Sequence, residues 1–132
     1  MPARPHIRAK RTEAFGVKFR SILESEWATW LVENRIAWKY EPKTFRIGGV
    51  GYKPDVYLPD YRAWLEVKPY APKRIEILKC AWLSLATKEL VVIGAGHPGD
   101  GALIFEYREG YLKKQHYGAD SLLRLLLSSI KS

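Results

Sequence analysis

The sequence predicts an α/β protein in which helices cover both faces of a mixed β-sheet. Apolar residues recur at helical spacing in three segments, and short stretches between them alternate apolar and polar side chains. The run ELVVIGA at 89–95 is typical of a strand at the buried centre of such a sheet. With 132 residues, 47% of them hydrophobic, the chain suits one domain with its own core.

The first helix is expected to begin near residue 21. Ser21 followed three residues later by Glu24 matches a capping box. Pro42 cannot lie inside a helix, so the helix ends by Glu41. The apolar residues that share one face of this helix are Leu23, Trp27, Trp30 and Leu31.

Three strands are expected next, at 43–47, 52–58 and 63–68, with a glycine turn at 48–51 between the first two. Residues 73–87 then form a helix packed on the core, because apolar side chains return there at helical spacing. A buried strand follows at 89–95.

The last third of the chain is expected to add a hairpin and a helix. Residues 102–117 form the hairpin, which turns at Glu109-Gly110. Residues 119–132 form an amphipathic helix that either caps the core or makes the contact of a homodimer. The motif GAGHPG at 94–99 resembles a nucleotide-binding turn, but a strand and not a helix follows it, so we expect a glycine-rich loop.

Composition narrows the classes of function. The chain carries 22 basic and 14 acidic side chains, a net charge of +8, which favours nucleic acid as the partner. Residues 1–19 are expected as a basic N-terminal arm that contacts phosphates or is simply solvated, and 20–132 as the single domain. Cys80 is the only cysteine, which excludes a disulfide framework. No apolar run is long enough for a membrane span, and we expect a cytoplasmic protein without a membrane partner.

The two strands at 52–58 and 63–68 place charged residues together. If residues 59–62 form a four-residue loop, Asp55 lies directly opposite Glu66, and Lys68 points to the same face. Trp64 shares this face, which makes it a candidate for lining a site. The opposite face is wholly apolar, with Pro54, Val56, Leu58, Ala63, Leu65 and Val67.

This face can hold a metal ion. Two carboxylates so close repel each other, and a divalent cation such as Mg²⁺ relieves that repulsion. The cation can activate water, while Lys68 adds a fixed positive charge for a phosphate. The plain alternative is a half-exposed hairpin in which Glu66 and Lys68 make cross-strand ion pairs.

KPD at 53–55 with LEVK at 65–68 resembles the PD-(D/E)xK nuclease superfamily. RSILE at 20–24, IAWKYEP at 36–42 and YKPDVYLP at 52–59 are similar in order and spacing to phage endonuclease-I-type Holliday junction resolvases, and also to endonuclease subunits of two-subunit transposases. The resemblance covers roughly residues 20–95.

The resemblance implies a restriction-endonuclease-like fold with an αβββαβ core and the activity of a Mg²⁺-dependent DNA endonuclease, in which Mn²⁺ substitutes. It implies that Asp55, Glu66 and the carbonyl of Val67 bind the metal and that Lys68 is the catalytic lysine. Glu24 would complete the acidic cluster or hold a second metal, although its capping box already explains it structurally. Glu41, where the chain leaves the helix toward the sheet, is a further candidate for the set.

The substrate implied by the resemblance is branched or Holliday junction DNA, in recombination inside a bacterial or phage-infected cell. Two alternatives to a self-sufficient endonuclease stay open. The chain could be a non-catalytic nucleic-acid-binding module, or it could be the nuclease subunit of a transposase-like complex.

Overall fold

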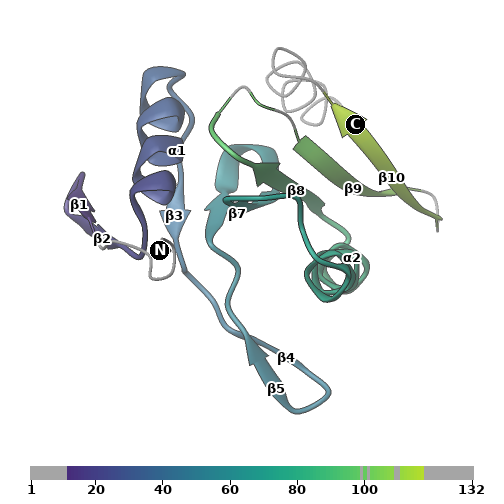
Figure 1. Cartoon of the computed structure of the whole chain (residues 1–132). Coiled ribbons are helices and arrows are strands. Elements are labelled where there is room, and N and C mark those ends of the chain that lie inside the picture. Colours follow the sequence, from purple (N-terminus) through teal and green to yellow (C-terminus); the bar gives the residue numbers. More distant parts are fainter. Residues whose placement is uncertain (1–11, 99, 101, 109–110, 118–132) are drawn as a thin grey trace, which may run out of the picture.

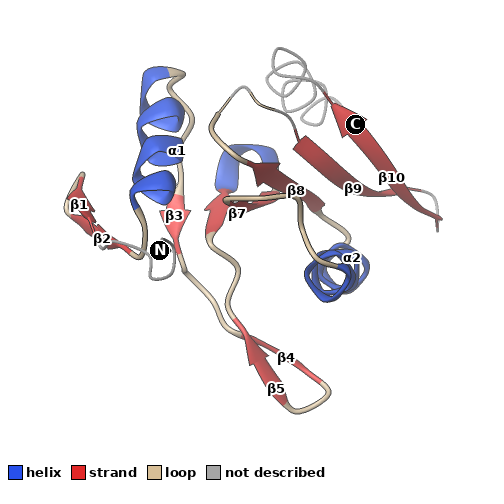
Figure 2. Ribbon diagram, viewed as in Figure 1, coloured by secondary structure: helices blue, strands red, loops and turns tan. Residues whose placement is uncertain are grey.

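The computed structural model describes residues 12–98, 100, 102–108 and 111–117, and they form a mixed α/β fold (Figures 1 and 2). The strands of the main sheet are β3 (Lys39–Tyr40), β6 (Val56–Leu58), β7 (Ala63–Lys68), β8 (Leu90–Ala95), β9 (Ala102–Arg108) and β10 (Tyr111–Tyr117). Their order is β10-β9-β8-β7-β6-β3. The β7–β8 pair is parallel and the other neighbours are antiparallel, so the sheet is mixed as predicted.

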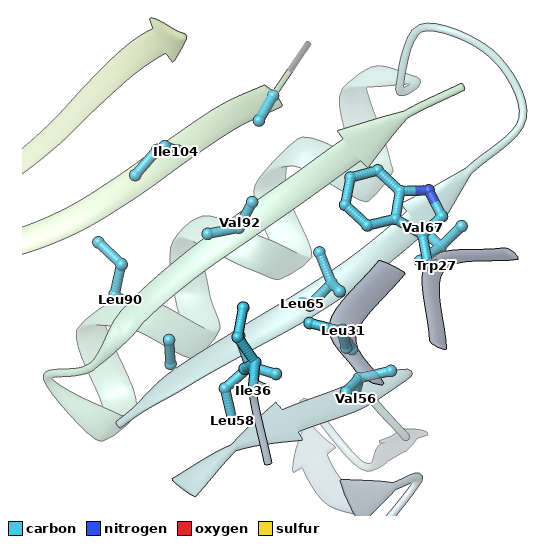
Figure 3. Close-up of a cluster of buried hydrophobic side chains, with 12 residues drawn as sticks. Trp27, Leu31, Ile36, Val56, Leu58, Leu65, Val67, Leu90, Val92 and Ile104 are labelled. Carbon is cyan, nitrogen blue, oxygen red and sulfur yellow. The ribbon is translucent and has the colours of Figure 1, made fainter. Parts of the chain in front are cut away.

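Two helices cover opposite faces of this sheet. Helix α1 (Ile22–Glu33) packs Trp27 and Leu31 into a cluster with β6, β7 and β8 (Figure 3). Helix α2 (Arg74–Thr87) contributes Cys80 and Leu83 to a second cluster, which contains the alternate residues of the same strands. Strands β7 and β8 are therefore buried on both sides, which explains the continuous apolar run of β8.

Helix α1 begins as the sequence predicts. The Ser21 hydroxyl accepts the backbone N–H of Glu24 at 3.1 Å, which satisfies one donor of the first turn. The helix ends at Glu33, well before Pro42, because Arg35 adopts a positive φ of 57° that breaks the helical path. The chain then enters β3, a strand of two residues that the sequence pattern does not reveal.

The hairpin β6–β7 has the predicted register. Val56 pairs with Leu65, and Leu58 pairs with Ala63. The connection is the 3₁₀ helix η1 (Pro59–Tyr61) followed by Arg62 in the left-handed region. The apolar face expected from the alternation is the face covered by α1.

The strand predicted at 52–58 is two strands. Strand β5 (Val50–Tyr52) ends before Pro54, and β6 begins after it, because proline has no N–H to donate to a ladder. Strand β5 pairs with β4 (Phe45–Ile47) in a separate hairpin, so the predicted strand at 43–47 exists but lies outside the main sheet. Its place in the αβββαβ order is taken by β3.

The N-terminal region contains a second small hairpin, β1 (Thr12–Ala14) with β2 (Val17–Phe19). The predicted basic arm at 1–19 therefore includes a folded segment. Phe19 is 1% exposed and contacts Trp38 and Tyr40, so the hairpin is fixed to the domain. Residues 1–11 lie outside the described residues.

The C-terminal part agrees with the sequence as far as it is described. Strands β9 and β10 pair antiparallel with Arg108 opposite Tyr111, which confirms the predicted hairpin. The expected turn residues 109–110 lie outside the described residues. The helix expected at 119–132 lies outside the described residues, so its predicted role in capping the core or forming a dimer stays a prediction. Neither of the described helices is long and apolar enough to cross a membrane.

Candidate active site

Asp55, just before β6, and Glu66, in β7, are joined by hydrogen bonds between the backbone of each segment and the carboxylate of the other. The backbone N–H of Asp55 donates to Glu66 Oε1 at 2.6 Å, and the N–H of Val67 donates to Asp55 Oδ2 at 2.8 Å. The two residues are only 7% and 5% exposed. The predicted pair therefore exists, but it is buried under α2 and does not face open solvent.

Burial in this position disfavours the charged form of both carboxyls. Burial is the main cause that raises the pKa of Asp55 well above its usual range, and repulsion from Glu66 raises this pKa further. The hydrogen bond from the Val67 N–H acts in the opposite direction and lowers it. Burial also raises the pKa of Glu66, although the Asp55 N–H and the charge of Lys68 oppose it. The pair thus stores electrostatic repulsion that a cation can relieve.

Lys68 lies beside the pair at the end of β7. Its Nζ is 4.0 Å from Glu66 Oε2 and 3.2 Å from Glu76 Oε2. Burial acts to lower the pKa of Lys68, but the charges of Glu66 and Glu76 outweigh it, so the pKa is raised. The ammonium is therefore held charged at the site.

Glu76 is a member of the site that the sequence does not reveal. It lies in the first turn of α2, and its Oε1 accepts the N–H of Lys73 at 2.8 Å, which caps the helix. The same carboxylate pairs with Lys68 through its other oxygen. No sequence pattern singles out Glu76, because its contact with Lys68 depends on how α2 packs against β7.

Tyr52, at the end of β5, borders the pair on the side of α2. The Tyr52 side chain acts to lower the pKa of Glu66, against the effect of burial. The Tyr52 hydroxyl also lies 3.7 Å from Cys80 Sγ. Burial raises the pKa of Cys80 to about 12, so this thiol stays protonated, in agreement with its expected role as a small core residue.

Glu24 lies close to the pair but is held by other partners. Its Oε1 accepts the Tyr40 hydroxyl at 2.6 Å and the Arg20 N–H at 3.0 Å. Burial and this hydrogen bond raise the pKa of Tyr40 to about 12. The charge of Glu24 still acts to raise the pKa of both Asp55 and Glu66. Among the described residues, no three acidic, imidazole or thiol side chains are grouped closely enough to hold one metal ion.

Arg20 and Glu41 lie beside Asp55, on the side of Glu24 and Tyr40, and we call these four residues the rim of the site. The Arg20 guanidinium pairs with Glu41, and its Nη2 lies 3.9 Å from Asp55 Oδ1. The Glu41 N–H donates to the Asp55 carbonyl at 2.7 Å. Glu41 thus lies where the sequence motif suggests, whereas the role of Arg20 depends on the meeting of α1 with β3 and β6.

Trp64 does not line the site. It shares the face of Glu66 as predicted, but it is 5% exposed and packs under Phe45 and Tyr57. Its indole N–H donates to Glu89 Oε1 at 2.9 Å, and the Tyr57 hydroxyl donates to the other oxygen of Glu89. Burial on both faces of the sheet makes Trp64 a core residue.

The described residues of the glycine motif, 94–98, run from the end of β8 into a loop beside the end of β7, and Gly99 lies outside the described residues. Gly94 belongs to β8, the N–H of Gly96 donates to the Lys68 carbonyl at 2.7 Å, and strand β9 follows. The expected loop is therefore confirmed, and the helix of a dinucleotide site does not follow it. His97 in this loop contacts Glu26 of α1, with Nδ1 2.5 Å from Oε1.

The donor chemistry of the pair fits Mg²⁺ or Mn²⁺. Asp55 and Glu66 offer only carboxylate oxygens, the ligands that hard divalent cations prefer. Asp55 Oδ1 accepts no hydrogen bond among the described residues, and its nearest cationic group is Arg20 at 3.9 Å. This oxygen is therefore buried with a free lone pair next to a second carboxylate.

No protein-family model, curated protein or solved structure matches this chain. The function is therefore inferred from the residues of the site and their geometry.

Proposed function

We propose that this protein is a metal-dependent endonuclease that hydrolyses DNA phosphodiester bonds on a restriction-endonuclease-like fold. One observation carries the proposal: two buried carboxylates, Asp55 and Glu66, are locked together with Lys68 beside them at the end of one hairpin. A structural ion pair does not need a second buried carboxylate, which raises the pKa of the first and costs stability. A bound cation would account for the two carboxylates, and a phosphate would account for Lys68.

Asp55, Glu66 and the backbone carbonyl of Val67 would hold the cation. When bound, the cation supplies an activated water and neutralises charge on the phosphate. Lys68, held charged by Glu76, stabilises the negative charge that develops on the phosphate oxygens during in-line attack. Arg20 and Glu24 hold the surrounding rim in place through Glu41 and Tyr40.

DNA is the partner that the charge of the chain favours, because a net charge of +8 attracts a phosphate backbone. A branched or four-way junction is the substrate we propose on the sequence resemblance, within a cytoplasmic recombination reaction.

The test incubates the purified full chain with linear duplex, four-way junction and single-stranded DNA, each with Mg²⁺, Mn²⁺ or EDTA. We expect cleavage with either cation and none with EDTA. Asp55→Asn, Glu66→Gln and Lys68→Ala should each lower the cleavage rate by at least about a hundredfold, because each removes charge stabilisation at the phosphate. DNA binding should be largely retained.

Two exposed residues provide matched controls. Asp60→Asn in η1 and Lys39→Ala in β3 remove the same charges from the same hairpin region but away from the site, and they should cleave like the unaltered protein. DNA binding without cleavage under any condition would instead indicate a non-catalytic module. Equal cleavage of all three DNA forms would contradict the junction preference alone.

A further inference from the structure

The turn end of hairpin β4–β5 projects from the domain. The hairpin shares no ladder with the main sheet, and Figure 1 shows its turn extending beyond α2. Ile47 pairs with Val50, so Gly48 and Gly49 form a two-residue turn. Both have positive φ, 57° and 87°, as a tight turn of the I′ type requires.

The charge of this hairpin is of one sign. We call residues 43–53 the basic hairpin: they contain Lys43, Arg46 and Lys53, all exposed, and no acidic residue. The backbone of the turn is open to solvent, since a Cβ at Gly48 or Gly49 would meet no other atom within 4 Å. Val50 at the tip is 62% exposed. A polyanion can therefore approach the backbone closely without meeting a repelling charge.

The basic hairpin is held firmly at its base. The Phe45 ring packs edge-on against Trp64 at 5.4 Å and against Trp82 at 6.1 Å between centroids. Lys43 Nζ lies 4.9 Å from the centre of the Phe45 ring. Because the aromatic anchor belongs to the core under α2, the cations are presented in fixed positions and little entropy is lost when they bind.

The same hairpin leads directly into the proposed active site. Tyr52 is its last strand residue, and Asp55 follows three residues later. From Gly49 to Asp55 the chain spans at most about 21 Å. At about 3.4 Å per nucleotide along one strand, the tip can reach phosphates up to about six nucleotides from the site.

We propose that the basic hairpin binds the phosphate backbone of duplex DNA on one side of the bond that is cut. The duplex nature of the partner rests on the proposed function, whereas the contact itself rests on the charge, exposure and rigid anchoring of the hairpin. Lys43, Arg46 and Lys53 position the duplex and take no part in the reaction at the phosphate.

The test measures duplex binding in EDTA as a function of salt concentration. The variant Lys43→Gln/Arg46→Gln/Lys53→Gln is compared with the control Arg35→Gln/Lys39→Gln/Arg62→Gln, which removes three exposed cations elsewhere. Three lost phosphate contacts should flatten the slope of log K against log salt by about 2.7. The control should keep the slope of the unaltered protein, and the unfolding temperatures of both variants should match it.

Cleavage kinetics with Mg²⁺ separate this inference from the proposed function. The hairpin variant should raise KM by at least about tenfold and leave kcat within about twofold, since its contacts are the same in the ground state and the transition state. Hairpin-dependent binding without any cleavage would remove the nuclease proposal and support the hairpin contact. Salt slopes and KM equal to those of the control variant, or no duplex binding by the unaltered protein, would overturn the hairpin contact.

Discussion

Asp55 and Glu66 illustrate how a fold can hold two like charges out of water. Each gives one oxygen to a backbone N–H of the other strand, which fixes both carboxylates in place. Burial and mutual repulsion nevertheless raise the pKa of Asp55. A carboxyl of this kind binds its proton more tightly in the folded state than in the unfolded state.

The free energy of unfolding should therefore depend on pH in a defined direction. Without divalent cations, the contribution of Asp55 is fully present below its unfolded pKa of about 4, and it is lost as pH rises through the folded pKa. Asp55→Asn should raise the free energy of unfolding at pH 8 by about 1–3 kcal/mol, because it removes a buried charge and keeps an acceptor for Val67. Urea unfolding in EDTA at pH 5 and pH 8 measures both effects. A variant less stable than the unaltered protein at pH 8 would contradict the assigned pKa direction.

Glu76 is predicted to position Lys68 without touching substrate. Glu76→Gln keeps the acceptor that caps α2 but removes the charge that helps to hold Lys68. We expect roughly tenfold slower cleavage, and a free energy of unfolding lowered by no more than about 1 kcal/mol because the ion pair is partly exposed. The alkaline limb of the pH–rate profile should also move to lower pH, because Lys68 loses a charge that raises its pKa. An unchanged profile would mean that Glu76 only caps the helix.

At the scale of residues, the sequence predicts side-chain contacts between adjacent strands better than contacts between segments that are distant in the chain. The alternation of apolar and charged side chains defines the register that places Asp55 against Glu66. Arg20, Tyr40 and Glu76 reach the site from elements whose packing no local pattern encodes. Trp64 shares the predicted face but is buried, because alternation identifies a face without showing that a helix covers it.

The elements follow the sequence wherever a pattern is long enough to be distinctive. Helix α2 and strands β7 and β8 begin and end within a residue of their predicted bounds. Strand β3 and hairpin β1–β2 have only two or three residues per strand, which is too short for a period to appear. Pro54 divides one predicted strand into two and so creates the separate hairpin β4–β5.

The contact between β8 and α1 provides a test at this scale. A Cβ on Gly94 would lie 2.3 Å from Cζ2 of Trp27, whose indole N–H donates to the Gly96 carbonyl. Gly94→Ala should therefore lower the free energy of unfolding by about 1–3 kcal/mol through overpacking. Denaturant unfolding measures the loss, and the same substitution in a Trp27→Leu background should cost less because the ring is gone. Equal losses in both backgrounds would place the strain elsewhere.

At the scale of the whole molecule, the sheet carries the site at one end of its central strands. Helices on both faces exclude water from β7, so the hairpin must place its charged residues where β7 ends. The mixed α/β class follows from the order of apolar segments in the sequence, whereas the strand order and the separate basic hairpin depend on tertiary pairing.

The central claim is that Asp55 and Glu66 form a divalent-cation site, and it can be tested without DNA. Titration of the full chain with Mn²⁺, followed by the paramagnetic resonance signal of the free ion, measures binding directly. We predict saturable binding that Asp55→Asn and Glu66→Gln each weaken by at least about tenfold, while Asp60→Asn in η1 binds like the unaltered protein. Equal binding by all four proteins would contradict the claim.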